Sequence, residues 1–239
     1  TRAGIPIGDL SSGLYSVIGI LSALLSREQT NKGQHIDMSL LDVQISLLTY
    51  MATMQTLSSI DPEPIGNAHF VHVPYNSFTT QNGFVVIAVI TDAFWEALLD
   101  VVNVDSLRDS KFSKSVDRLK NQEFIEAELN KILSTKPSEF WIKALNDAKV
   151  PCGPINTFSQ ALSDEQVIHR NMVVEVEHPD GGKVKMPGNP VKLSYTNEDS
   201  YTPPPHLGKN TKEILKEWAG YDEIKIQTLI DKNIVQSID

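Results

Sequence analysis

An aspartate near the start of the chain is the residue whose type and setting best suit covalent chemistry. Asp9 follows Gly8 and comes directly before an apolar, helix-periodic segment, a position typical of a helix N-cap. A carboxylate there would accept backbone N–H groups and face the positive end of the helix dipole, so we expect it to stay ionised near neutral pH. Such a group serves as a cap, a metal ligand, a general base or a nucleophile. Most aspartates before helices are caps, and spacing alone leaves these roles open.

Other candidate groups give weaker signals. His69 and His72 lie three residues apart in a segment expected to be loop or strand, where such a pair does not converge, so no metal site is predicted. The lone Cys152 fits no nucleophile motif and suits a structural thiol. The Gly66–His69 stretch combines a flexible glycine with hydrogen-bonding side chains after a proline-rich break. Its composition favours a plain linker over a ligand-binding loop.

Two apolar helices are expected to position Asp9. Apolar residues recur with helical spacing from Leu10 to Leu25, and small residues line a second face, which predicts a helix buried on more than one side. After a turn at residues 30–34, a short strand is expected at His35–Met38. Ser39 then begins a second helix that continues to Met54, in a capping-box-like pattern with Asp42.

The rest of the chain mixes strands and helices, which indicates an α/β fold. Asn82–Gly83 between two β-rich runs predicts a hairpin, and Thr91 is expected to cap a helix over residues 92–102. The polar stretch at 103–121 is expected to be a solvated face. Further helices are predicted at 124–133, 137–147, 158–162, 211–218 and 222–231, and further strands at 172–178, 183–186 and 191–195.

Composition narrows the class of protein. The chain has 239 residues and a net charge of −9, which argues against a nucleic-acid or anionic-membrane partner. The apolar run from Leu14 to Leu25 is interrupted by serines and is too short to span a bilayer comfortably, so no membrane partner is expected. A single cysteine fits a reducing compartment, the cytoplasm or, in a eukaryote, the mitochondrial matrix. The chain starts at Thr1 without a signal peptide, and we expect it to be the C-terminal part of a longer protein.

The order of the motifs resembles that of the family III CoA-transferases, the group of formyl-CoA transferase, carnitine CoA-transferase and α-methylacyl-CoA racemase. The segments that carry the resemblance span nearly the whole chain: Ile7–Gly13, Gly33–Ser39, His72–Tyr75, Asn82–Gly83, Val150–Pro154 and Leu207–Gly208.

The resemblance implies roles for individual residues. Asp9 would attack an acyl-CoA thioester to give a mixed anhydride and free CoA thiolate, and amides near Gly8 and Leu10 would bind the substrate oxyanion. The loop residues Gly66, Asn67 and His69 would form a substrate wall. Leu40 would lie near the thiol end of CoA. Coenzyme A enters as a thioester substrate, a free carboxylic acid is the acceptor, and no permanently bound cofactor is implied.

The resemblance also implies a domain plan. Residues 1–59 would end the first part of a Rossmann-like, CoA-binding large domain, residues 60–125 would form a small α+β domain, and residues 126–239 would supply a linker helix and return to the large domain. The family's N-terminal half, which holds most contacts to the CoA nucleotide, would precede Thr1. Family members are interlocked dimers, so a homodimer is implied for the whole protein.

Two alternatives remain open at this stage. One is an epimerase of the α-methylacyl-CoA racemase type that uses Asp9 as acid and base, although Gly8–Gly13 is more similar to the segment of the transferases. The other is a non-catalytic fragment that needs a separate nucleotide-binding half.

Overall fold

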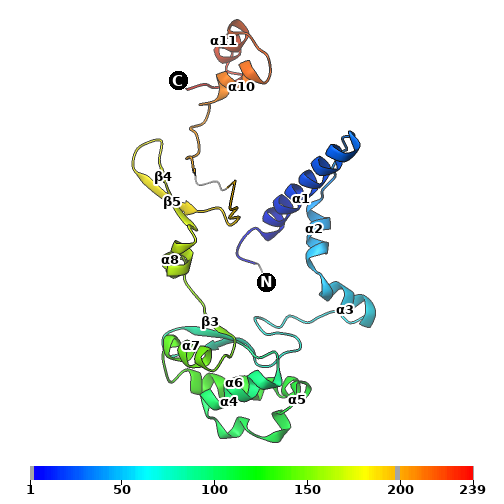
Figure 1. Cartoon of the computed structure of the whole chain (residues 1–239), viewed down its shortest axis with the longest axis vertical. Coiled ribbons are helices and arrows are strands. Elements are labelled where there is room, and N and C mark those ends of the chain that lie inside the picture. Colours follow the sequence, from blue (N-terminus) through cyan, green and yellow to red (C-terminus); the bar gives the residue numbers. More distant parts are fainter. Residues whose placement is uncertain (1–2, 197–199, 239) are drawn as a thin grey trace. The chain divides into compact units, whose positions relative to one another are not determined.

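The computed structural model describes residues 3–196 and 200–238. The chain divides into two compact units, Thr1–Pro154 and Ile155–Asp239, and Figure 1 shows the elements of each. Both units mix helices with small antiparallel sheets, in agreement with the predicted α/β class.

The first unit begins with a long helix, α1 (Ile7–Thr30), which ends at Asn31 in the left-handed conformation. Pro6 stands before the first helical residue, and the backbone N–H of Leu10 donates to its carbonyl oxygen over 3.0 Å. Only Ser11 and Ser12 of this helix are buried. The prediction that α1 is buried on more than one side is therefore wrong for this chain, because its leucines and isoleucines are 40–69% exposed in the described structure.

The second predicted helix is divided in two. Ser39 caps α2 (Leu40–Leu47) by accepting the N–H groups of Leu41 and Asp42, as expected. Thr49 has a φ of +50°, which interrupts the helix, and α3 (Tyr50–Ser58) follows. The strand predicted at His35–Met38 is absent, since these residues pair with no strand in the described structure and connect α1 to α2 without regular secondary structure.

An antiparallel sheet forms around the predicted hairpin. Strands β1 (Tyr75–Thr79) and β2 (Phe84–Ala88) pair with Thr79 opposite Phe84, which confirms the Asn82–Gly83 turn. Strand β3 (Cys152–Pro154) adds to the other edge of β2. Pro151 before this strand and Pro154 at its end lack an N–H, so β3 suits an edge position.

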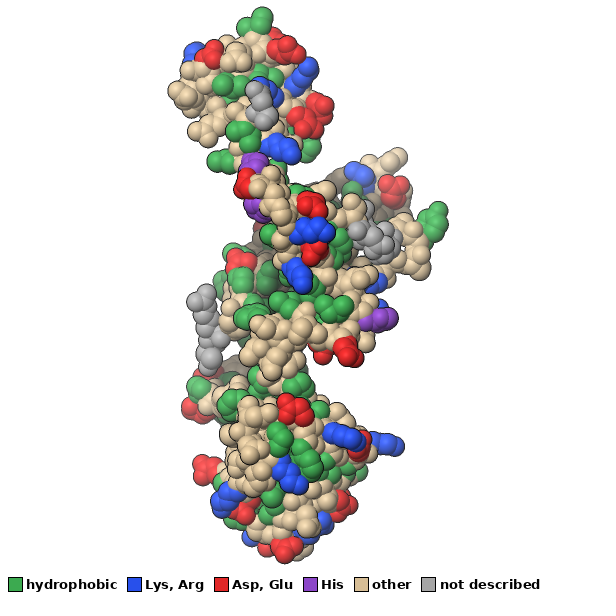
Figure 2. Space-filling view, turned by 90° about the vertical axis from the view of Figure 1, so that its left-hand side faces the viewer, with side chains coloured by type: hydrophobic (Ala, Val, Ile, Leu, Met, Phe, Trp, Pro, Cys, Tyr) green, Lys and Arg blue, Asp and Glu red, His purple; other side chains and the backbone are tan. Residues whose placement is uncertain are grey.

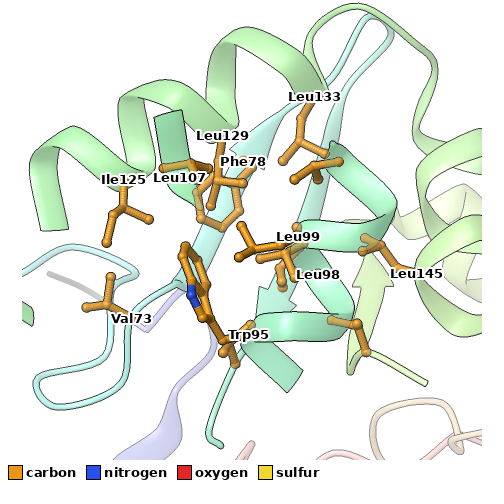
Figure 3. Packing of buried hydrophobic residues seen from close by; sticks show 14 of the residues in the cluster. Val73, Phe78, Trp95, Leu98, Leu99, Leu107, Ile125, Leu129, Leu133 and Leu145 are labelled. Atoms are coloured by element: carbon orange, nitrogen blue, oxygen red, sulfur yellow. The ribbon is translucent and has the colours of Figure 1, made fainter. Parts of the chain in front are cut away.

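Helices cover one another and this sheet to form the core of the first unit. Its elements after the hairpin are α4 (Asp92–Val102), η1 (Asp105–Leu107), η2 (Ser110–Phe112), α5 (Ser115–Lys120), α6 (Gln122–Leu133) and α7 (Ser138–Asp147). Thr91 caps α4 through the N–H of Phe94, as predicted. Figure 3 shows Ile125 and Leu129 of α6 directed toward Phe78 and Trp95, and all four are buried.

The stretch at 103–121 does not form the solvated face that its polarity suggested. Leu107, Phe112 and Arg118 are buried within it. The guanidinium of Arg118 donates to the backbone oxygens of Val73, Phe112 and Ser113 and pairs with Asp92 over 2.7 Å. The polarity of the sequence misled here because the core contains an arginine, which uses four of its five N–H donors in hydrogen bonds.

The core also bears on the proposed domain plan. Helix α6 spans the boundary expected between residues 125 and 126, and Ile125, Leu129 and Leu133 belong to one buried cluster with Val73 and Leu145. The compact unit continues to Pro154. How residues 1–59, 60–125 and 126–239 divide within a whole family protein stays a prediction.

The second unit contains two small substructures. The hairpin of β4 (Val173–Glu177) and β5 (Lys183–Pro187) follows α8 (Phe158–Ser163) and α9 (Glu165–His169), and it turns at the predicted Asp180–Gly182. The helices α10 (Thr211–Glu217) and α11 (Glu223–Asp231) close the chain as predicted. The strand predicted at residues 191–195 is absent, because these residues pair with no strand among the described residues.

One helix of the described chain, α1, is long and apolar enough to cross a membrane by length and composition alone, and 11% of its most apolar window is buried. The apolar run Leu14–Leu25 is by itself too short to span a bilayer, whereas the whole helix has 24 residues.

Candidate active site

Asp9 lies in the first turn of α1 but is not its cap. The helix begins at Ile7, three residues earlier than predicted, and no side chain caps it. The fixed φ of Pro6, −74°, is close to the helical value and lets the helix begin directly after it. Asp9 is exposed, and its carboxylate has no hydrogen bond or ion pair with any residue the structure describes. It is therefore an unpaired carboxyl group near the positive end of a helix dipole.

The two neighbours of Asp9 differ in what they offer. The backbone N–H of Leu10 is engaged with Pro6, so that amide is not available to a substrate oxyanion, while the Leu10 side chain is 51% exposed. Gly8 is the second helical residue, where backbone N–H groups normally lack an intrahelical partner. Of the two predicted oxyanion donors, the Gly8 amide stays a prediction, whereas the Leu10 amide is engaged with Pro6.

A glutamine connects the start of α1 to the start of α2. A Cβ atom at Gly8 would come within 3.3 Å of the Gln44 side chain, so the glycine permits close approach there. Gln44 also donates to the carbonyl oxygen of Leu40 over 3.2 Å. The structure thus brings Gly8 and Leu40 together through a residue that the sequence analysis missed. The position of Gln44, one helical turn after Leu40, was the feature of the sequence that could have indicated this contact.

The Gly66–His69 loop is more ordered than a linker. Gly66 has a φ of +65°, which suits glycine. Asn67 donates from its side chain to Ser77 Oγ over 3.1 Å. The backbone N–H of His69 donates to Tyr75 O over 3.0 Å, closing the segment onto strand β1.

The imidazole of His69 organises the next turn. Its Nδ1 accepts the backbone N–H groups of Val71 and His72, at 3.0 and 3.1 Å. Because Nδ1 is an acceptor, the proton of the neutral ring lies on Nε2. The ring stacks on Phe70 and Tyr75, with centroids 4.5 and 5.1 Å away.

The two histidines of this loop converge, contrary to the prediction. Their ring centroids lie 4.7 Å apart. Burial, with a smaller contribution from His72, lowers the pKa of His69 below its usual value. The described residues hold no cluster of three or more histidine, cysteine, aspartate or glutamate side chains suited to a metal ion. No hydrogen bond between described residues joins this loop to Asp9.

The remaining candidates lie elsewhere. Cys152 donates to Asn146 Oδ1 and to the carbonyl oxygen of Ile142, and burial raises the pKa of its thiol, which suits the structural role predicted for it. A groove of about 320 Å³ runs beside the middle of α1, where Gly19, Ser22 and Ala23 face residues 34–37.

A sequence model of CoA-transferase family III matches residues 1–211 of the chain. The chain belongs to CoA-transferase family III. This confirms the resemblance inferred from the order of the motifs. A crystal structure of a CAIB/BAIF family protein from Brucella suis has the same fold, with a TM-score of 0.70 and 31% identity over 82% of this chain and 51% of that protein.

Curated relatives of this family III chain carry transferase names. The chain is 33% identical to the succinyl-CoA:glutarate CoA-transferase of Mus musculus, over 98% of its own length and 54% of the relative. It is 34% identical to the acetyl-CoA:oxalate CoA-transferase of Acetobacter aceti, over 90% of its length and 55% of the relative. The chain therefore spans about half the length of the curated relatives it matches.

Proposed function

We propose that this family III chain takes part in moving CoA between an acyl-CoA thioester and a free carboxylic acid, with Asp9 as the nucleophile. The observation that carries the proposal is the unpaired, exposed carboxylate of Asp9 in the first turn of α1, in a chain whose named relatives transfer CoA. A carboxylate without a structural partner is free to react, whereas a capping carboxylate would first have to leave its backbone donors.

The proposed reaction has four balanced steps, each an acyl transfer. A carboxylate oxygen of Asp9 attacks the thioester carbonyl, forming a mixed anhydride and releasing CoA thiolate. The thiolate attacks the aspartyl carbonyl, which releases the donor acid and leaves Asp9 as a CoA thioester. The acceptor carboxylate then attacks that thioester, forming a second anhydride and freeing the thiolate. Attack of the thiolate on the acceptor carbonyl gives the new acyl-CoA and restores Asp9.

Two neighbouring groups assist in this proposal. The backbone N–H of Gly8, at the dipole-positive end of α1, stabilises the oxyanion formed in each attack. Leu40, held by Gln44 beside the start of α1, contacts the thiol end of CoA.

The Gly66–His69 loop forms one wall of the acceptor site. Its Asn67 side chain and the Nε2–H of His69 supply neutral hydrogen-bond donors of the kind that bind carboxylate oxygens. We propose a short dicarboxylic acid as acceptor, because glutarate and oxalate appear in the names of the relatives above. The whole protein is proposed to act as a homodimer, as the family resemblance implies.

Trapping the aspartyl intermediates tests this proposal. A protein sample that contains this chain and shows CoA-transferase activity is incubated with acyl-CoA and then with hydroxylamine. Its peptides are then analysed by mass spectrometry. We expect a hydroxamate on Asp9 and none on Asp42, a matched acid in the first turn of α2. Asp9→Asn should lose the adduct and transfer, whereas Asp42→Asn should keep both.

Two results would overturn the transferase proposal. Transfer that continues in Asp9→Asn would remove Asp9 from the mechanism. Exchange of deuterium into the α-carbon of the acyl group, without CoA transfer to free acids, would instead identify the epimerase alternative.

A further inference from the structure

The longest helix of the chain presents a continuous apolar stripe that nothing in the described structure covers. Its members recur at helical spacing along one face and are 40–69% exposed: Leu10, Leu14, Val17, Ile18, Leu21, Leu24 and Leu25. At 3.6 residues per turn these positions fall within about a third of the helix circumference. No charged residue occurs between Leu10 and Ser26.

The opposite face of α1 contacts other segments of this chain. Gly8 packs against Gln44, and Tyr15 lies within hydrogen-bond distance of Ser46 at 3.4 Å, so this side meets α2. Gly19 and Ala23 border the groove toward residues 34–37. Small residues thus face the chain's own neighbouring segments, while the large aliphatic residues face outward.

The next two helices also expose apolar side chains. Leu41 and Ile45 of α2 are 65% and 57% exposed, and Leu57 of α3 is 83% exposed. Figure 2 shows hydrophobic side chains interspersed at the surface. Monomers rarely expose contiguous apolar patches larger than about 300–600 Å², so a stripe over about four helical turns marks an interaction surface.

A lipid bilayer is a poor occupant for this surface. The groove beside the middle of α1 is lined by His35 and Asp37 as well as by Gly19 and Ala23. If α1 crossed a bilayer, these polar side chains would lie near the hydrocarbon midplane, where ionisable groups are strongly disfavoured.

A polypeptide is the occupant that the length of the relatives favours. The chain accounts for 54% of the mouse relative and 51% of the Brucella protein with the same fold, so nearly half of each has no counterpart here. An uncharged aliphatic stripe matches the apolar core of an obligate interface, in which charged residues are depleted.

We propose that the stripe of α1, with the exposed leucines and isoleucine of α2 and α3, is the docking surface for a segment equivalent to the half of family III proteins that this chain does not match. The proposal rests on family membership, relative length and burial. It does not depend on the chemistry of Asp9, so the two can fail separately.

Cysteine accessibility tests the proposal without measuring activity. In a Cys152→Ser background, Leu21→Cys reports on the stripe, and Val116→Cys reports on an exposed apolar position of α5 outside it, since Val116 is 66% exposed. Thiol labelling rates are compared between the 239-residue chain and the same chain joined to the segment of the Brucella suis protein that it does not match.

We expect labelling at position 21 to slow by about 100-fold or more in the joined protein, as for a site that opens only transiently, while labelling at position 116 stays unchanged. Equal labelling at position 21 in both proteins would overturn the proposal. Slowed labelling of the 239-residue chain in vesicles of phosphatidylcholine and phosphatidylglycerol would assign the surface to a membrane instead. Protection that rises with the concentration of the chain alone would assign it to a second copy.

Discussion

At the residue scale, the side chains that matter most are those whose hydrogen bonds the sequence could not reveal. Asp9 was identified by its place before an apolar helix, but its freedom from capping depends on Pro6, which begins the helix earlier. His69 was identified as part of a loop, yet the role of its Nδ1 depends on the fold of residues 70–72. Both residues were singled out from the sequence, whereas backbone geometry decides that Asp9 is unpaired and that His69 accepts two backbone N–H groups.

His69 gives a pH prediction. Its pKa is lowered in the folded protein, mainly by burial, so the unfolded chain binds more protons as the pH falls below the ordinary histidine value of about 6.5. Neutral His69 therefore stabilises the fold above that value, and this contribution is lost as the pH drops through the lowered folded-state pKa. Protonation of Nδ1 would also remove the acceptor of Val71 and His72.

Amide hydrogen exchange checks this. Protection of the Val71 and His72 amides should fall on acidification below about pH 6.5, relative to amides of the core helices. The variant His69→Asn, whose Oδ1 replaces Nδ1 as an acceptor, should keep protection at low pH. If acid leaves these amides unchanged in the unmodified chain, the role assigned to Nδ1 is wrong.

Arg118 gives a stability prediction. Replacing it by methionine leaves three backbone oxygens without their donor, two of them beside η2 and one at Val73. We expect Arg118→Met to lower the free energy of unfolding by about 3 kcal/mol, measured by urea denaturation. Lys120→Met, which removes an exposed lysine from the same helix, should change it by less than about 0.5 kcal/mol. Similar effects of the two would show that the buried guanidinium is unimportant.

At the scale of elements, the sequence predicted best where local signals decide the structure. The Asn82–Gly83 hairpin, the Thr91 cap, the Asp180–Gly182 turn and the last two helices all formed as expected. The failures required knowledge of distant partners. The strand at His35–Met38 found no edge to pair with, and the interruption at Thr49 has no signal in hydrophobic periodicity.

The cap of α4 gives a prediction at this scale. Thr91 Oγ1 accepts the N–H of Phe94 over 3.2 Å, at the start of a helix that buries Trp95, Leu98 and Leu99. Thr91→Ala should lower the free energy of unfolding by about 1 kcal/mol. Thr91→Ser should lower it much less, because serine keeps the hydroxyl group that accepts the Phe94 N–H. Equal loss in the two variants would show that the methyl group, not the cap, accounts for the effect.

At the scale of the whole molecule, the apolar residues between Val73 and Val150 are buried and those of α1 are exposed, for a physical reason. The cluster from Val73 to Val150 closes within this chain and could be identified by helical and strand periodicity. Helix α1 has an equally clear periodic pattern, but its apolar stripe is exposed. Hydrophobic periodicity shows which face of a helix is apolar, and it does not show whether the residues that bury that face belong to the same chain. The domain plan inferred from family resemblance depends on that missing information.

The central claim is that Asp9 exchanges acyl groups, and oxygen transfer tests it most directly. In the proposed sequence the acceptor acid supplies the bridging oxygen of the second anhydride, and cleavage by CoA leaves that oxygen on Asp9. Turnover with acceptor acid labelled with ¹⁸O should therefore place label in the peptide that contains Asp9 and none in the peptides of Asp37 or Asp42. Complete transfer of CoA with no label on Asp9 would contradict the account.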